Sequence, residues 1–91
     1  MREPQPWSNV YVMARIVNSI HEKVPELEAA LAAENWASLD SLAHAVKGNA
    51  LATGDNDVAN VAISLRVAAK MSEKNNATSL FEKLKELAKE I

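Results

Sequence analysis

Hydrophobic residues recur in steps of three and four along most of this chain, which is the spacing of a buried stripe on an α-helix. The first run predicts a long helix over residues 8–34. Its apolar positions are Val10, Met13, Val17, Ile20, Val24, Leu27 and Leu31. Pro25 lies inside this run, yet the stripe keeps its phase on both sides of it. We therefore predict a kink in one helix rather than a break between two.

A second stripe predicts a helix over residues 36–53. Its apolar positions are Trp36, Leu39, Ala43, Val46, Ala50 and Thr53. Asn35 has the side chain of an N-cap, and Gly54 is placed to end the helix in the left-handed conformation. Residues 1–7 precede the pattern as an N-terminal extension, from which Trp7 is expected to cover one end of the folded domain.

Two shorter stripes follow a turn at residues 55–57. The first predicts a helix over residues 56–72 and consists of Val58, Val61, Ala62, Leu65 and Ala69. After a loop at residues 73–76, the second predicts a helix over residues 77–91 and consists of Leu80, Leu84, Leu87 and Ile91. Ser79 and Glu82 have the spacing of a capping box. Four amphipathic helices joined by short loops predict an all-α fold, an up-and-down antiparallel four-helix bundle in residues 8–91.

Composition agrees with a helical domain and excludes several functions. The chain has 91 residues, 24% of them charged, only two glycines and a net charge of -2. Without a basic surface, nucleic-acid binding is disfavoured. The absence of cysteine rules out disulfides and thiolate metal sites, and no carboxylate completes a site with His21 and His44. Without an apolar run or signal peptide long enough for a membrane, we expect a cytoplasmic protein with no membrane insertion and no metal.

One face of the second predicted helix carries residues with a chemical use. His44, Lys47 and Gly48 are related by i, i+3 and i+4, so they share a face. At about 100° per residue, His44 lies roughly 120° from the centre of the buried stripe and should be exposed. An exposed imidazole beside a cation suits the acceptance of a phosphoryl group. Gly48 costs about 1 kcal/mol relative to alanine in mid-helix, which suggests that another backbone approaches closely there.

The sequence around these residues resembles the histidine-containing phosphotransfer (HPt) domains of multistep phosphorelays. Residues 43–50 read Ala-His-x-x-Lys-Gly-x-Ala, and Gly54 follows the histidine by ten positions. The resemblance extends to Pro-Glu-Leu at residues 25–27 and to the polar and aromatic pair at residues 35–36. Arg66 is a departure, because the third helix of the family commonly carries a glutamate there.

The resemblance implies a phosphocarrier, not an enzyme. His44 would accept a phosphoryl group through Nε2 from a receiver-domain aspartate and pass it to the aspartate of a second receiver. Lys47 would offset the charge of the phosphate, and Gly48 would leave clearance for the partner. The domain would need no cofactor of its own, because the receiver supplies Mg²⁺. Its partners would be response-regulator receiver domains and a hybrid sensor histidine kinase, and the resemblance leaves open whether this chain is a domain of that kinase or separate from it. We expect a monomer.

Apolar residues outside the buried stripes suggest where a partner docks. Val12 and Ile16 are i, i+4 neighbours, and Leu51 continues the row of His44 one heptad on. The Val12 and Ile16 row either packs against Trp7 or binds a receiver domain. The alternative function is a helical adaptor without phosphorylation, either an HPt-like bundle or an unrelated interaction module in which His44 is incidental.

Overall fold

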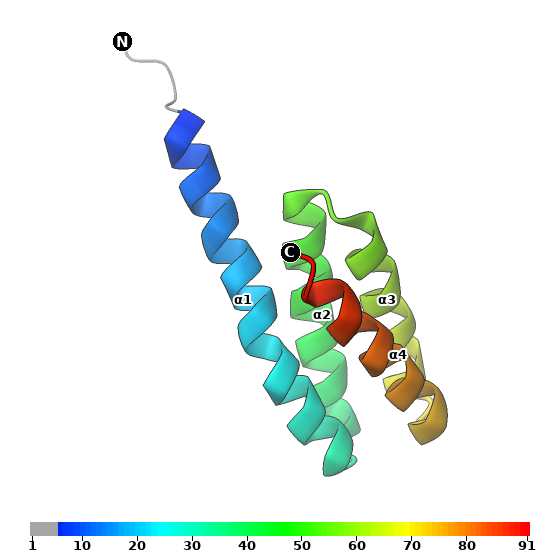
Figure 1. Ribbon diagram of the computed structural model, residues 1–91. Helices are drawn as coiled ribbons and strands as arrows, with labels where there is room; N and C mark the ends of the chain where they lie inside the picture. The colour runs from blue at the N-terminus through cyan, green and yellow to red at the C-terminus, as the bar shows by residue number, and fades with distance from the viewer. Residues whose placement is uncertain (1–5) are drawn as a thin grey trace.

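The described part of the chain is a bundle of helices that run alternately up and down (Figure 1). The computed structural model describes residues 6–91, with side chains from residue 12 onward. The helices are α1 (Pro6–Ala32), α2 (Trp36–Thr53), α3 (Asn56–Lys70) and α4 (Lys74–Ala88). Each helix packs against its two neighbours around the bundle, so α1 contacts α2 and α4, and α3 contacts the same two. Residues 6–91 contain no strand, which confirms the predicted all-α four-helix bundle.

The core follows the predicted stripes of α2 and α3. Its largest fully buried side chains are Phe81, Ile20, Leu27, Leu39, Leu65, Leu84, Val46 and Val58. Alanines fill the positions between them, such as Ala43 and Ala50 on α2 and Ala62 and Ala69 on α3, which are 0–1% exposed. Small side chains let the helices approach closely while still burying apolar surface.

The stripe predicted for α1 is wrong at Met13, and its first member, Val10, lies outside the described side chains. Met13 is 43% exposed, whereas Ile20, Leu27 and Leu31 are buried. Figure 1 shows the first turns of α1 running past the ends of the other helices. The bundle is accordingly 52 Å long but only 22 by 19 Å in cross-section. Pro25 lies within the continuous helix, as expected.

The prediction for α4 is wrong in its start and at Ile91, and it is incomplete in its buried face. The helix begins at Lys74, so residues 74–76 are not loop, and Ser79 lies inside the helix and not at a capping box. The buried face is formed by Ala77, Phe81, Leu84 and Ala88, while Ile91 is 36% exposed. Of the predicted stripe, Leu84 is fully buried, and Leu80 and Leu87 pack partly buried against the core. Two of the three buried positions that the pattern missed are alanines, which a leucine pattern overlooks.

All three links between helices use the same tight geometry. Each contains one residue with positive φ, and the next residue donates its N–H to the carbonyl oxygen five positions earlier, over 2.8–3.0 Å. The left-handed residues are Glu34 (φ 53°), Gly54 (φ 77°) and Ser72 (φ 54°). This hydrogen bond is that of the Schellman motif, which reverses the chain in very few residues. Sequence reasoning found only Gly54, because the other two are not glycines.

The residue that completes each turn also stands at the start of the next helix. Asn35 Oδ1 accepts from the Ser38 N–H at 3.2 Å, which confirms the predicted N-cap of α2. Asp55 Oδ1 accepts from the Val58 N–H at 3.1 Å in the same way. The ends of α1 lie two residues before the predicted ones, and α3 ends at Lys70 instead of residue 72. The side chain of Trp7 lies outside the described ones, so its covering role stays a prediction.

The described helices do not have the properties of membrane spans. None combines the length and low charge that a crossing of the bilayer requires.

We predict opposite stability changes at two of the left-handed positions. Gly54→Ala should lower the free energy of unfolding by about 1 kcal/mol. The added Cβ would have open space, but alanine would be held at a positive φ that is unfavourable for a residue with a side chain. Ser72→Gly should raise the free energy of unfolding by up to about 1 kcal/mol, because glycine adopts a positive φ without strain. The greater flexibility of glycine in the unfolded chain offsets part of this gain. Thermal melts should show these as Tm shifts of roughly 4–8 °C per kcal/mol. Shifts of the same sign for both variants would contradict this account of the turns.

Candidate functional site

His44 lies on the flank of α2 that faces α3, and its side chain is exposed, as the helical arithmetic predicted. Its neighbours in sequence decide this, because Ala43 and Val46 are fully buried and direct the next positions outward. Nδ1 of the imidazole lies 3.1 Å from Nη1 of Arg66 on α3. The ring is therefore exposed but held at one of its two nitrogens.

Arg66 is itself anchored by an acidic side chain of α2. Its Nε donates to Oδ1 of Asp40 at 2.8 Å, and the two side chains are 26% and 28% exposed. The hydrogen bond from Arg66 is the main reason that the pKa of Asp40 is lowered from its usual value, with Lys70 adding a weaker favourable charge. Asp40, Arg66 and His44 thus form one polar chain that links α2 to α3.

This polar chain was missed by sequence reasoning. Asp40 and His44 are i, i+4 neighbours on one face of α2, which is a usable signal. The third member, Arg66, is 22 residues further along the chain than His44, and no periodicity within α2 points to it. Its place was recognised only as a departure from the pattern of the family.

Lys47 and Gly48 lie next to His44, about one turn further along α2. The side chain of Lys47 is partly buried, as expected for a stem that lies on apolar surface. Gly48 is exposed, and a Cβ added there would meet nothing within 4 Å. Packing inside the bundle therefore does not require glycine at this position, and helix propensity does not favour it either, because alanine would make the helix more stable.

The apolar residues proposed for partner binding are divided between two sides of α2. Val12 is 53% exposed and Ile16 is partly buried; both line a shallow groove between α1 and α2 together with Asn49. The amide of Asn49 donates to the hydroxyl of Ser19 at 3.1 Å, which places Asn49 on the α1 flank. His44 faces α3 instead. Leu51, which is 54% exposed, continues the row of His44.

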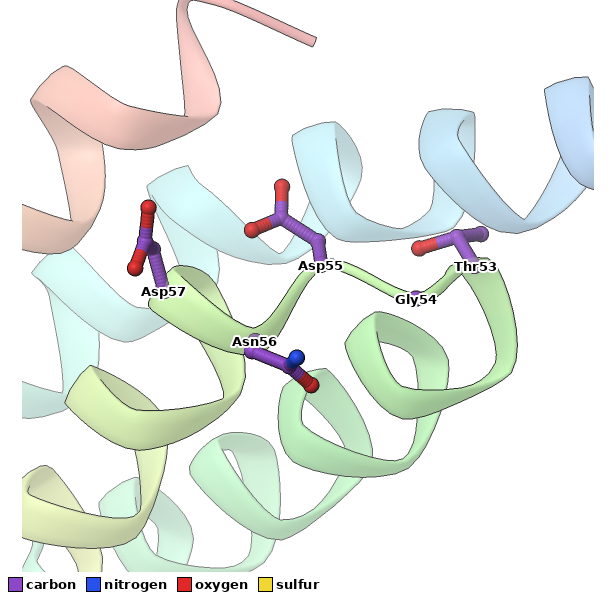
Figure 2. A pocket seen from close by; sticks show the side chains of 5 residues that line it. All are labelled: Thr53, Gly54, Asp55, Asn56 and Asp57. Atoms are coloured by element: carbon purple, nitrogen blue, oxygen red, sulfur yellow. The ribbon is translucent and has the colours of Figure 1, made fainter.

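A polar hollow at the turn between α2 and α3 is explained by capping. It is lined by residues 53–57, and Figure 2 shows the side chains of Asp55 and Asp57 pointing to one side and Asn56 to the other. Thr53 Oγ1 donates to the carbonyl oxygen of Ala50 at 3.1 Å, and Asp55 caps α3. In the part of the chain with described side chains, no three His, Cys, Asp or Glu residues gather as a metal site would require.

Comparison with protein families decides the assignment. The family model described as "Hpt domain" matches residues 12–91. The chain belongs to the Hpt domain family. Hpt domains are phosphocarriers of phosphorelays rather than enzymes, and they interact with receiver domains. Neither the comparison with curated proteins nor that with solved structures gave a match.

The open space at Gly48 leads to a prediction with two opposite effects. Gly48→Gln should raise the free energy of unfolding by up to about 1 kcal/mol, because glutamine is a better helix former. The same variant should bind a receiver domain more weakly, because its side chain occupies the exposed surface next to His44. Thermal melts and titration with a receiver domain measure the two effects. Receiver affinity equal to that of the unmodified Hpt domain would contradict a clearance role.

Proposed function

We propose that this Hpt domain carries a phosphoryl group on His44 between the aspartates of two receiver domains. The observation that carries the proposal is the environment of the imidazole, which is exposed on α2 and held at Nδ1 by Arg66. Nε2 is consequently the ring nitrogen available to a partner. An exposed side chain on a rigid helix meets the requirement that the nucleophile be presented to another protein in a defined orientation.

The transfer follows from ordinary phosphoryl chemistry. Nε2 attacks the phosphorus of an aspartyl phosphate, the N–P bond forms, and the P–O bond to the aspartate breaks. The ring attacks in the form that carries its proton on Nδ1, this proton is released to solvent once the N–P bond has formed, and the receiver regains an ionised carboxylate. The second transfer reverses these steps, because the carboxylate of another receiver attacks phosphorus and the imidazole leaves with a proton from solvent.

The charge of the transferring group is shared between the two proteins. Lys47 lies one turn from His44 and provides a cation to the phosphoryl oxygens. The receiver contributes an acidic pocket with Mg²⁺, which stabilises the transition state by the usual electrostatic effect of a bound metal. The Hpt domain therefore needs no cofactor of its own.

The proposed setting is a cytoplasmic phosphorelay. The donor is a hybrid sensor histidine kinase, to which the domain is attached or from which it is separate, and the acceptors are response-regulator receivers. We propose that the domain acts as a monomer, because one exposed histidine on one bundle is sufficient for the chemistry above.

The docking surface proposed for the receiver spans the outer face of α2. Gly48 opens this face, with Leu51 and His44 towards α3 and the groove of Val12 and Ile16 towards α1. Apolar side chains exposed on both sides of a small residue suit a partner that must approach the backbone closely.

His44→Gln tests the proposed function directly. The variant should accept no phosphoryl group from a phosphorylated receiver, while its Tm stays near that of the unmodified domain, because exposed substitutions usually change stability by less than about 0.5 kcal/mol. Radiolabel transfer and acid lability of the label measure acceptance. Labelling that persists in the variant places the acceptor elsewhere. If the unmodified domain binds receivers but takes no label, the adaptor alternative is correct.

The double variant Val12→Asp and Ile16→Asp tests the docking surface. It should weaken receiver binding several-fold, since charge replaces exposed apolar contacts, whereas a small phosphodonor should still label His44. The matched control is Met71→Asp, which changes an apolar residue that is 63% exposed and lies at the C-terminal end of α3, away from the turn between α2 and α3. A double variant that instead loses cooperative unfolding, with the same defect after removal of residues 1–7, would assign this row to internal packing.

A further inference from the structure

The contact between Arg66 and His44 determines where the imidazole carries its proton. A guanidinium has five N–H donors and no acceptor, and it stays charged at any pH that the protein survives. Because Arg66 Nη1 lies 3.1 Å from His44 Nδ1, Nδ1 must accept this hydrogen bond through its lone pair. The neutral ring held in this way has its proton on Nε2. A carboxylate at position 66 would select the opposite form, since it accepts from Nδ1–H.

The anchor at Asp40 makes the contact directional. Nε of Arg66 donates to Asp40 at 2.8 Å while Nη1 points to the imidazole, so two nitrogens of one planar group are used at once. Asp40 and His44 both project from α2 one turn apart, and Arg66 reaches them from α3. The orientation of the ring therefore depends on the packing of two helices rather than on the rotamer of His44 alone.

We infer that Arg66 is a positioning residue that prolongs the lifetime of phosphohistidine at His44 by keeping Nδ1 unprotonated. The inference rests on the proposed function, because it concerns the phosphorylated form of the same side chain. Before attack the ring proton moves from Nε2 to Nδ1 through solvent, which gives Nε2 the lone pair that forms the N–P bond. Nδ1 then loses this proton to solvent, so the phosphorylated ring again has a lone pair on Nδ1. The hydrogen bond from Arg66 thus fits both the resting ring and the phosphorylated ring, and it is absent only from the form that attacks, in which Nδ1 carries the proton.

The lifetime depends on Nδ1 because of the leaving group. In hydrolysis, water attacks phosphorus, the N–P bond breaks, and its electron pair returns to Nε2; the products are inorganic phosphate and imidazole. When Nδ1 is protonated, the ring leaves as neutral imidazole, whereas an unprotonated ring must leave as an anion or take a proton during the step. Arg66 occupies the lone pair that this proton needs and adds a like charge beside it.

Other charged groups near His44 act in both directions. On α2 they are Asp40, one turn before it, and Lys47, nearly one turn after it; on α3 they are Arg66 and Lys70. Lys70 interacts with Asp40 through its charge, so it is the closest match to Arg66 in charge and helix. The described contact from α1 is that of Ser19 with Asn49, on the opposite flank of α2.

The first experiment measures the proton directly and needs no phosphorylation. Long-range ¹H–¹⁵N spectra of the full chain distinguish protonated from unprotonated ring nitrogens. Near pH 8 the unmodified domain should show His44 with the proton on Nε2, and Arg66→Ala should change this towards a mixture of the two forms. A ring protonated at Nδ1 in the unmodified domain would overturn the inference.

The second experiment follows loss of phosphohistidine after labelling with phosphoramidate, at pH values from 5 to 8. Arg66→Ala should hydrolyse about three- to tenfold faster than the unmodified domain, the effect of one charged hydrogen bond at a partly exposed site, and the rise in rate should begin at a higher pH. Arg66→Lys, which keeps a charged donor without an acceptor, should recover part of the lifetime.

The control is Lys70→Ala, which removes a neighbouring cation of α3 and should leave the lifetime near that of the unmodified domain. If Lys70→Ala and Arg66→Ala accelerated hydrolysis of phosphohistidine equally, the effect would come from positive charge in general and not from the Arg66 contact. That result would overturn the inference. Equal lifetimes in Arg66→Ala and the unmodified domain would overturn it as well. Failure of the proposed function has a different signature, because the label would then be absent from the unmodified domain or persist in His44→Gln.

Discussion

Burial of one apolar stripe on α2 is the constraint on which the rest of the site depends. Leu39, Ala43, Val46 and Ala50 are all fully buried, and this fixes the rotation of the helix about its own axis. With the rotation fixed, His44 must lie outside the core and Gly48 must lie on the surface. Moving either residue inward would expose several apolar side chains, each contributing about 1–3 kcal/mol when buried.

The turn at Gly54 adds the second constraint, which is the level at which α2 and α3 face each other. A Schellman turn that is followed at once by the Asp55 cap leaves almost no slack between the two helices. Residues on α2 and α3 are therefore paired by their distance from this turn. Arg66 meets Asp40 and His44 because of this pairing, and a longer loop would permit other registers.

The polar chain from Asp40 to His44 contributes little to stability by comparison. Its side chains are about one-quarter exposed or more, and ion pairs in such settings are typically worth under about 1 kcal/mol. Its value lies in orientation: a charged donor that cannot accept determines which nitrogen of the ring is free. Stability therefore comes from the alanine-rich core, and chemical specificity comes from the side chains of Asp40, Arg66 and His44 on its surface.

The sequence by itself determined the local features of this protein. Periodicity located the helices and showed that His44 is exposed, and the pattern of residues 43–50 indicated the family. These features depend on the angle of each residue about its own helix, which spacing encodes directly. The N-cap at Asn35 and the left-handed Gly54 were also predictable, because each depends on the chemistry of one residue.

Only the tertiary structure decided which residues of the other helices lie against each face of a given helix. It placed Arg66 against His44, put the Val12 and Ile16 groove on the other flank of α2, and left Met13 exposed on α1. It also showed that α4 begins at Lys74, two residues after Ser72, which is a non-glycine residue in a left-handed conformation. Spacing within one helix carries no information on the helix beside it, since that depends on how all four stripes are buried together.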